Sequence, residues 1–83
     1  MHFAYGTVPD VKPFHVKAIW TDGTFTYIKH EASESPAVYE TKDGQPAILD
    51  PKVPEPGLFV IHKVIDSGYL ALGKARLPFA LKD

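Results

Sequence analysis

The side chains that could do chemistry are scattered, and their spacing joins none of them into a reactive site. No two of the four histidines are spaced to hold one metal ion within a single strand or turn, so we expect surface or half-buried imidazoles instead. They are His2, His15, His30 and His62. The chain has no cysteine, which excludes disulfides, thiolate metal ligands and a cysteine nucleophile.

The serines and aspartates are explained by turns and loops. The serines lie in polar segments, without a nucleophile-elbow pattern or a recognised spacing to a histidine; they are Ser33, Ser35 and Ser67. Asp22 and Asp43 directly precede a glycine, a combination typical of turns. No glycine-rich phosphate-binding motif is present. We therefore predict a protein without enzymatic activity, metal or other cofactor.

One segment combines aromatic and basic side chains. Phe25 and Tyr27 share a face of a predicted strand, with Lys29 and His30 nearby, and such an arrangement could stack single-stranded bases. Against this, the formal net charge is −1 and the basic residues do not cluster. An aromatic pair at this spacing more often packs in a core or across strands. A β domain that binds carbohydrate or single-stranded nucleic acid is therefore only the alternative function.

The backbone that positions these side chains is predicted to be all β. With 83 residues the chain forms one domain, and 45% hydrophobic residues are enough for an ordered core. Eight prolines and six glycines divide it into short pieces, and the longer pieces lack an apolar stripe at helical spacing. No apolar run approaches the roughly 18 residues that a membrane-spanning helix requires.

The turn signals predict a small antiparallel β-sandwich of about seven short strands. The expected strands are residues 14–20, 24–30, 37–41, 46–49, 58–65, 69–72 and 75–81. The expected turn residues are Asp22, Gly23, Asp43, Gly44, Gly68 and Gly73. The segment Asp50–Gly57 holds three prolines, so we expect a stiff connector or an edge segment there.

Alternation along the strands predicts which faces are buried. In the first strand one mostly apolar face consists of Phe14, Val16, Ala18 and Trp20. Leu58–Ile65 is apolar on both faces and is expected to be the central, most buried strand. Pro78 cannot donate a ladder hydrogen bond, which places the last strand at an edge or a bulge.

Four segments, taken in order, carry a resemblance. They are Trp20–Ile28 with its Asp-Gly turn and Thr-Tyr pair, Pro36–Tyr39, the Asp43-Gly44 turn, and Val60–Val64 followed by Tyr69–Lys74, which ends in Leu-Gly-Lys. This ordered set resembles the C-terminal domain of the TrbG/CagX family of conjugal-transfer and type IV secretion proteins. The similarity runs from about Pro13 to Leu81, nearly the whole chain.

The resemblance implies a non-enzymatic β-sandwich of the outer-membrane core complex, located in the periplasm at the outer membrane. The implied partners are a short outer-membrane lipoprotein, whose extended segment packs along the sandwich, the inner-to-outer membrane scaffold protein, and further copies in a ring. Residues 13–83 would be the domain and residues 1–12 an N-terminal extension or linker. The signal peptide and N-terminal domain of the longer exported protein would lie outside this chain.

Four aromatic residues are candidate anchors for such a partner, because large aromatic side chains dominate interface energies. They are Trp20, Phe25, Tyr27 and Tyr39. Core packing is the alternative role for each, and we expect it for Phe25. An extended partner would add main-chain hydrogen bonds to a sheet edge or lie across an exposed aromatic strip.

Two departures from the family pattern fall in the proline-rich segment. Asp50-Pro51 replaces an asparagine–aromatic pair, and Pro54–Gly57 replaces a glycine–acid pair. Any partner contact that differs from the family should therefore differ there first. Because Pro46, Pro51 and Pro78 interrupt the predicted edges, the isolated domain is expected to be a monomer.

Overall fold

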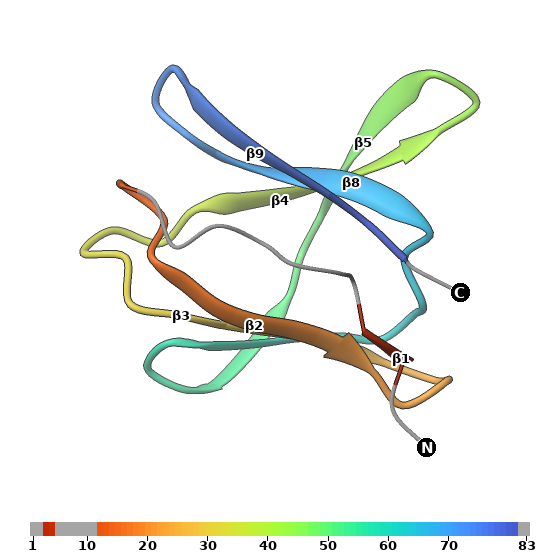
Figure 1. The fold of residues 1–83 in the computed structure, drawn as a ribbon, viewed down its shortest axis with the longest axis horizontal. Helices are drawn as coiled ribbons and strands as arrows, with labels where there is room; N and C mark the ends of the chain where they lie inside the picture. The colour runs from red at the N-terminus through yellow and green to blue at the C-terminus, as the bar shows by residue number, and fades with distance from the viewer. Residues whose placement is uncertain (1–2, 5–11, 82–83) are drawn as a thin grey trace.

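Two antiparallel sheets face each other in the computed structural model, which describes residues 3–4 and 12–81 (Figure 1). The strands are β1 (Phe3–Ala4), β2 (Val16–Thr21), β3 (Thr26–His30), β4 (Ala37–Lys42), β5 (Gln45–Leu49), β6 (Lys52–Glu55), β7 (Leu58–Ile61), β8 (Ser67–Leu72) and β9 (Ala75–Ala80). The first sheet has the order β1-β2-β3-β7-β6 and the second β5-β4-β8-β9. The predicted all-β sandwich is confirmed.

Two strands exceed the seven expected from the sequence. The proline-rich segment forms β6, an edge strand of the first sheet, and turns into β7 through Pro56-Gly57, where Gly57 has a φ of 83°. The predicted extension, residues 1–12, lies largely outside the described residues, and so does His2. Within this range Phe3–Ala4 pairs with β2 as β1 and belongs to the sheet.

A β-bulge in β2 corrects the predicted faces of the first hairpin. The register with β3 shifts between Val16 and Ala18, which inserts one extra residue into β2. Beyond the bulge the side chains therefore change faces: Ile19 is buried, whereas Ala18 is exposed and Trp20 lies on the outer face. The prediction that Ala18 and Trp20 share the buried face with Val16 is wrong for this reason.

The turns between neighbouring strands form largely as predicted. Asp43 and Gly44 have φ values of 54° and 75°, a two-residue type I′ turn whose twist matches the flanking strands. Gly23 and Gly73 also have positive φ, at 94° and 63°. The predicted central strand is shorter than expected. β7 lies between β3 and β6 but ends at Ile61, and residues 62–66 form a loop that carries the chain to the second sheet.

Gly68 is not a turn residue, contrary to the prediction. It lies inside β8, directly opposite Glu40 on β4, and its φ is not in the positive region. A Cβ atom at this position would lie 2.1 Å from the backbone oxygen of Tyr39. Glycine is therefore required by the close approach of two neighbouring backbones. The direction of the chain changes earlier, in residues 62–66.

The core is a layer of buried apolar side chains between the two sheets. It consists of Phe14, Val16, Ile19, Ile28, Val38, Phe59, Ile61, Ile65, Leu70, Leu77 and Phe79. Both sheets contribute, and Ile65 comes from the loop between them. The last strand alternates as predicted, with Leu77 and Phe79 inward, and Pro78 lies on the edge strand β9.

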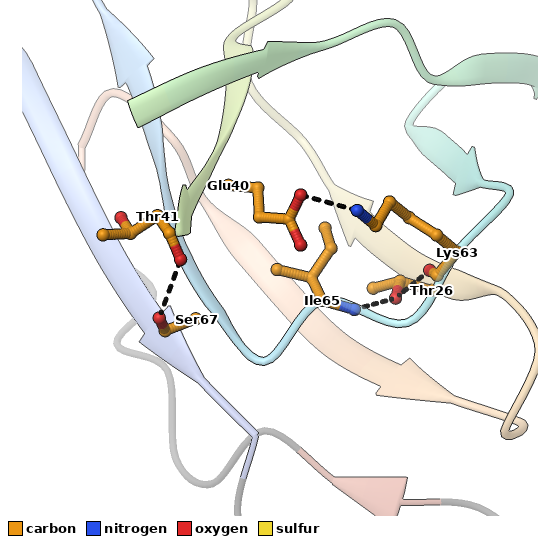
Figure 2. Close-up of polar contacts among 6 residues, drawn as sticks. All are labelled: Thr26, Glu40, Thr41, Lys63, Ile65 and Ser67. Carbon is orange, nitrogen blue, oxygen red and sulfur yellow. Dashed lines mark hydrogen bonds and ion pairs between the residues drawn. The ribbon is translucent and has the colours of Figure 1, made fainter. Parts of the chain in front are cut away.

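Polar side chains connect the two sheets through the loop after β7 (Figure 2). The hydroxyl of Thr26 on β3 donates to the backbone oxygen of Lys63 at 2.8 Å and accepts the N–H of Ile65 at 3.2 Å. The Nζ atom of Lys63 lies 2.7 Å from Oε1 of Glu40, which is mostly buried on the inner face of β4. A first-sheet strand and a second-sheet strand thus hold the same loop.

The close approach at Gly68 predicts an unequal response to alanine substitutions. Gly68→Ala should destabilise the domain by about 3 kcal/mol or more, because the new methyl group meets backbone rather than a movable side chain. Gly44→Ala is the control: its φ is positive but nothing lies near, so about 1–2 kcal/mol is expected. Chemical denaturation measures both. Equal losses would contradict the packing assigned to Gly68.

The hydroxyl of Thr26 can be tested by removing it without changing the shape of the side chain. Thr26→Val should lower the free energy of unfolding by about 2–3 kcal/mol, because a partly buried carbonyl and a buried N–H both lose this hydroxyl as a partner. Thr24→Val, in an exposed turn, should stay within about 0.5 kcal/mol of the parent chain. A neutral Thr26→Val variant would show that the loop is held by packing alone.

Candidate functional site

The outer face of the first sheet brings together three of the four predicted anchors. Trp20 and Tyr27 are direct cross-strand neighbours, and their rings stack with centroids 5.3 Å apart at 15°. Phe25 directly precedes β3 and packs against His62, with centroids 4.9 Å apart at 44°. We call these four side chains the aromatic strip. Phe25 is half-buried on this outer face, so the prediction that it packs in the core is wrong.

The β-bulge and the first turn together position the strip. The bulge turns Trp20 outward, opposite Tyr27. The carboxylate of Asp22 accepts the N–H groups of Thr24 and Phe25 at 2.9 and 2.8 Å through Oδ1, and the Tyr27 hydroxyl at 2.8 Å through Oδ2. One turn residue therefore fixes the loop and the orientation of the Tyr27 ring.

These hydrogen bonds change the acidity of both partners. The N–H of Phe25, then the N–H of Thr24 and the Tyr27 hydroxyl, lower the pKa of Asp22 from 3.8 to about 2, because all three stabilise the charged form. The hydrogen bond to Asp22 raises the pKa of Tyr27, because deprotonation would break this bond and place a phenolate beside a carboxylate. Tyr27 is thus held as a neutral hydrogen-bond donor.

Tyr39, the fourth predicted anchor, lies on the opposite side of the molecule. It stacks on Tyr69 across β4 and β8, with centroids 4.9 Å apart at 16°, and the Arg76 guanidinium lies 5.2 Å from the Tyr69 ring. Tyr39 therefore cannot act with the other three anchors in one contact. Tyr39 was named from the sequence but Tyr69 was not, because their stacking joins two strands that are distant in the chain.

The surroundings of the strip are apolar with charges of both signs. The row that contains Trp20 and Tyr27 continues through Val60 to Lys52 at the edge. The adjacent row of this face contains Lys29 on β3 and Glu55 on β6. A phosphate backbone would require a clear excess of positive charge, which this face does not have.

The described histidines do not gather into one cluster: the backbone of His15 lies beside the end of β3 that holds His30, and His62 follows β7. His30 is buried at the end of β3, where its ring packs 4.6 Å from that of Phe59 and Nδ1 accepts the N–H of Ala32 at 3.1 Å. Burial lowers the pKa of His30. His62 belongs to the strip, and His15 has a φ of 49°. Within residues 3–4 and 12–81 no group of three metal-binding side chains is close enough to hold an ion, and no pocket is enclosed.

Comparisons with known proteins add no relative to this description. No protein-family model matches the chain, and no curated protein matches it either. In the part of the chain that the structure describes, no helix is long and apolar enough to cross a membrane.

The bond between Tyr27 and Asp22 predicts a change in titration. Tyr27→Phe should raise the Asp22 pKa above about 2 but keep it below 3.8, since the Phe25 and Thr24 N–H groups remain. In the parent chain the Asp22 carboxylate stabilises the fold above about pH 3.8, and this stabilisation is lost as the pH falls towards 2. NMR titration of the Asp22 carboxyl carbon measures the midpoint. An identical midpoint in both proteins would show that the bond does not form in solution.

Proposed function

We propose that this domain is a non-enzymatic assembly module of a type IV secretion or conjugal-transfer outer-membrane core complex. In this role it docks an extended segment of a short outer-membrane lipoprotein across the aromatic strip and lies beside scaffold subunits in the periplasm. The proposal rests on the TrbG/CagX resemblance and on the geometry of the strip. The observation that carries it is the outward-facing set of Trp20, Tyr27, Phe25 and His62 on one sheet face.

The strip has the properties of a prepared contact surface. Its rings are large and apolar, and side chains of this kind provide most of the energy of protein interfaces. The stacked pair and the Asp22 hydrogen bond restrict the rings before a partner arrives. Binding would therefore lose less side-chain entropy than it would with free rings. A row of side chains across several strands suits an extended segment better than a compact ligand.

The segments that carry the resemblance coincide with elements of the fold. Trp20–Ile28 is the β2–β3 hairpin that bears most of the strip, and Pro36–Tyr39 leads into β4. Asp43-Gly44 is the β4–β5 turn. Val60–Val64 covers the end of β7 and the start of the following loop, and Tyr69–Lys74 runs through β8 into the β8–β9 turn. Each similar segment thus contributes a turn or a strand of the sandwich rather than an arbitrary stretch of chain.

The departures from the family also have a defined location. The segment Asp50–Gly57 contains β6, which lies at one edge of the first sheet, and Lys52 ends the row that contains Trp20 and Tyr27. A partner that follows this row would meet Lys52. We therefore expect the partner segment that lies beside Lys52 to carry a different charge from the corresponding segment of the family's partners.

The test is an NMR titration with synthetic peptides from short lipoproteins encoded beside the parent gene. Resonances of Trp20, Tyr27 and Phe25 should shift on binding. Trp20→Ala should raise the dissociation constant of the peptide by about tenfold or more, as expected for a central aromatic anchor.

Tyr69→Ala is the matched control, because it removes a ring from the stacked pair on the opposite face. Its peptide affinity should equal that of the parent chain. Two results would refute the proposal: no shift at about 1 mM peptide, or shifts confined to Tyr39 and Tyr69. Melting curves of both variants show whether a lost affinity comes from unfolding instead.

A further inference from the structure

The free edge of β5 is the least protected of the longer strand edges in the described residues. Strands β6 and β9, the other such edges, carry charged side chains: Lys52 and Glu55 on β6, and Arg76 on β9. Strand β5, with the sequence Gln-Pro-Ala-Ile-Leu, carries none. Charged side chains on an edge normally prevent strands of different molecules from pairing. The β4–β5 hairpin also extends away from the first sheet at the upper right of Figure 1, so neighbouring strands do not shield this edge.

The turn between β4 and β5 determines which backbone groups face outward. In a ladder closed by a two-residue turn, the pair that flanks the turn is hydrogen-bonded, and hydrogen-bonded and non-hydrogen-bonded pairs then alternate. Lys42 and Gln45 flank the turn, so Pro46 and Ile48 occupy non-hydrogen-bonded positions. Pro46 therefore costs the β4–β5 ladder no bond. Ile48 directs both its N–H and its C=O away from β4.

Ile48 is also the most exposed large apolar side chain among the described residues, with 68% of its surface accessible. It lies on the outer face of the second sheet, directly opposite Tyr39. Tyr39 lies opposite Tyr69, and Tyr69 opposite Pro78. One uncharged row thus crosses all four strands and ends at Ile48, beside the unpaired backbone groups of the same residue.

We propose that two copies of this chain pair in solution along β5, antiparallel and about a two-fold axis at Ile48. In this register Ile48 of each copy exchanges N–H···O=C bonds with Ile48 of the other. Pro46 lies opposite Asp50 of the second copy, where its carbonyl accepts the Asp50 N–H. The missing N–H of Pro46 is the single donor that the pairing lacks on each side, and the two second sheets become one continuous sheet.

The side chains and charges agree with this register. The two Ile48 side chains lie next to each other between the two Tyr39 rings, which removes the exposed apolar surface from water. Asp50 faces uncharged Pro46. No like charges are forced together at the axis.

The expected association is weak. Two five-residue edge strands bury far less than the roughly 1,200–2,000 Å² of a stable complex. The monomer predicted from the sequence should therefore dominate in dilute solution, and the dimer should appear at high concentration. This pairing uses the second sheet and leaves the aromatic strip of the first sheet free, so it does not depend on the proposed lipoprotein contact.

Sedimentation velocity from about 10 μM to about 1 mM tests the proposal, together with NMR over the same range. The parent chain should shift from monomer towards dimer, and the Ile48 amide should become more protected from hydrogen exchange as concentration rises. Ile48→Lys places two like charges at the axis and should weaken the dimer about tenfold or more.

Val53→Lys is the control, because Val53 is the other large apolar side chain exposed among the described residues, at 55%, and lies on β6. It should dimerise like the parent chain. The proposal is wrong if the parent stays monomeric at about 1 mM, if Ile48→Lys dimerises normally, or if Val53→Lys loses the dimer as well. Since both positions are exposed, both variants should fold, which circular dichroism checks.

Discussion

The two sheets are held together by one layer of buried apolar side chains, and the other features of the molecule adapt to that layer. A chain of 83 residues cannot build a second layer, so the strands that line the core contribute inward side chains from one face alone. At the border of the apolar layer, the hydroxyl of Thr26 and the carboxylate of Glu40 bind the loop after β7 through a hydrogen bond and an ion pair. No element within residues 3–4 and 12–81 covers the outer faces, and their aromatic residues stack on one another instead.

The stacked pairs show how a small domain keeps large rings on its surface. Trp20 with Tyr27, and Tyr39 with Tyr69, each cover part of the other's apolar area while one side stays accessible. Arg76 extends the second pair through its guanidinium, and Asp22 restrains the first through a hydroxyl. These arrangements limit exposure without removing the rings from possible contact. A flat aromatic surface of this kind contacts a partner across its face instead of enclosing a ligand in a pocket. The proposed assembly role requires a contact of the first kind.

Local sequence signals predicted much of the fold. The Asp-Gly turns, the strand alternation after Gly73 and the edge position of Pro78 were readable because each depends on residues close in the chain. Gly68 was misread because its requirement comes from Tyr39, a residue on another strand. Alternation alone could not show the bulge, since both alternate sets of β2 contain apolar residues.

The candidate site could be predicted only in part for the same reason. Trp20 and Tyr27 were each named as candidate anchors, but their stacking was not predicted, because it depends on the bulge that turns Trp20 outward. His62 and Tyr69 reach their partners through pairings that no local pattern encodes. The edge of β5 was missed as well, because Pro46 was expected to interrupt it. Hydrogen-bonded and non-hydrogen-bonded pairs alternate from the turn, and Pro46 occupies a non-hydrogen-bonded position. This proline therefore does not disturb the pairing with β4.

Because of the bulge in β2, the exposure of Trp20 depends on the number of residues in this strand and not on side-chain chemistry. One inserted residue between Val16 and Ala18 decides whether the tryptophan or Ile19 points to solvent. Both residues are apolar enough to occupy the interior, so composition does not favour one orientation over the other. Related sequences that differ by a single insertion or deletion before this position would present an inverted strand, with the same residues and a different surface. Comparison of such chains should therefore count residues from the first turn backwards, because identity at position 20 alone does not establish a shared contact face.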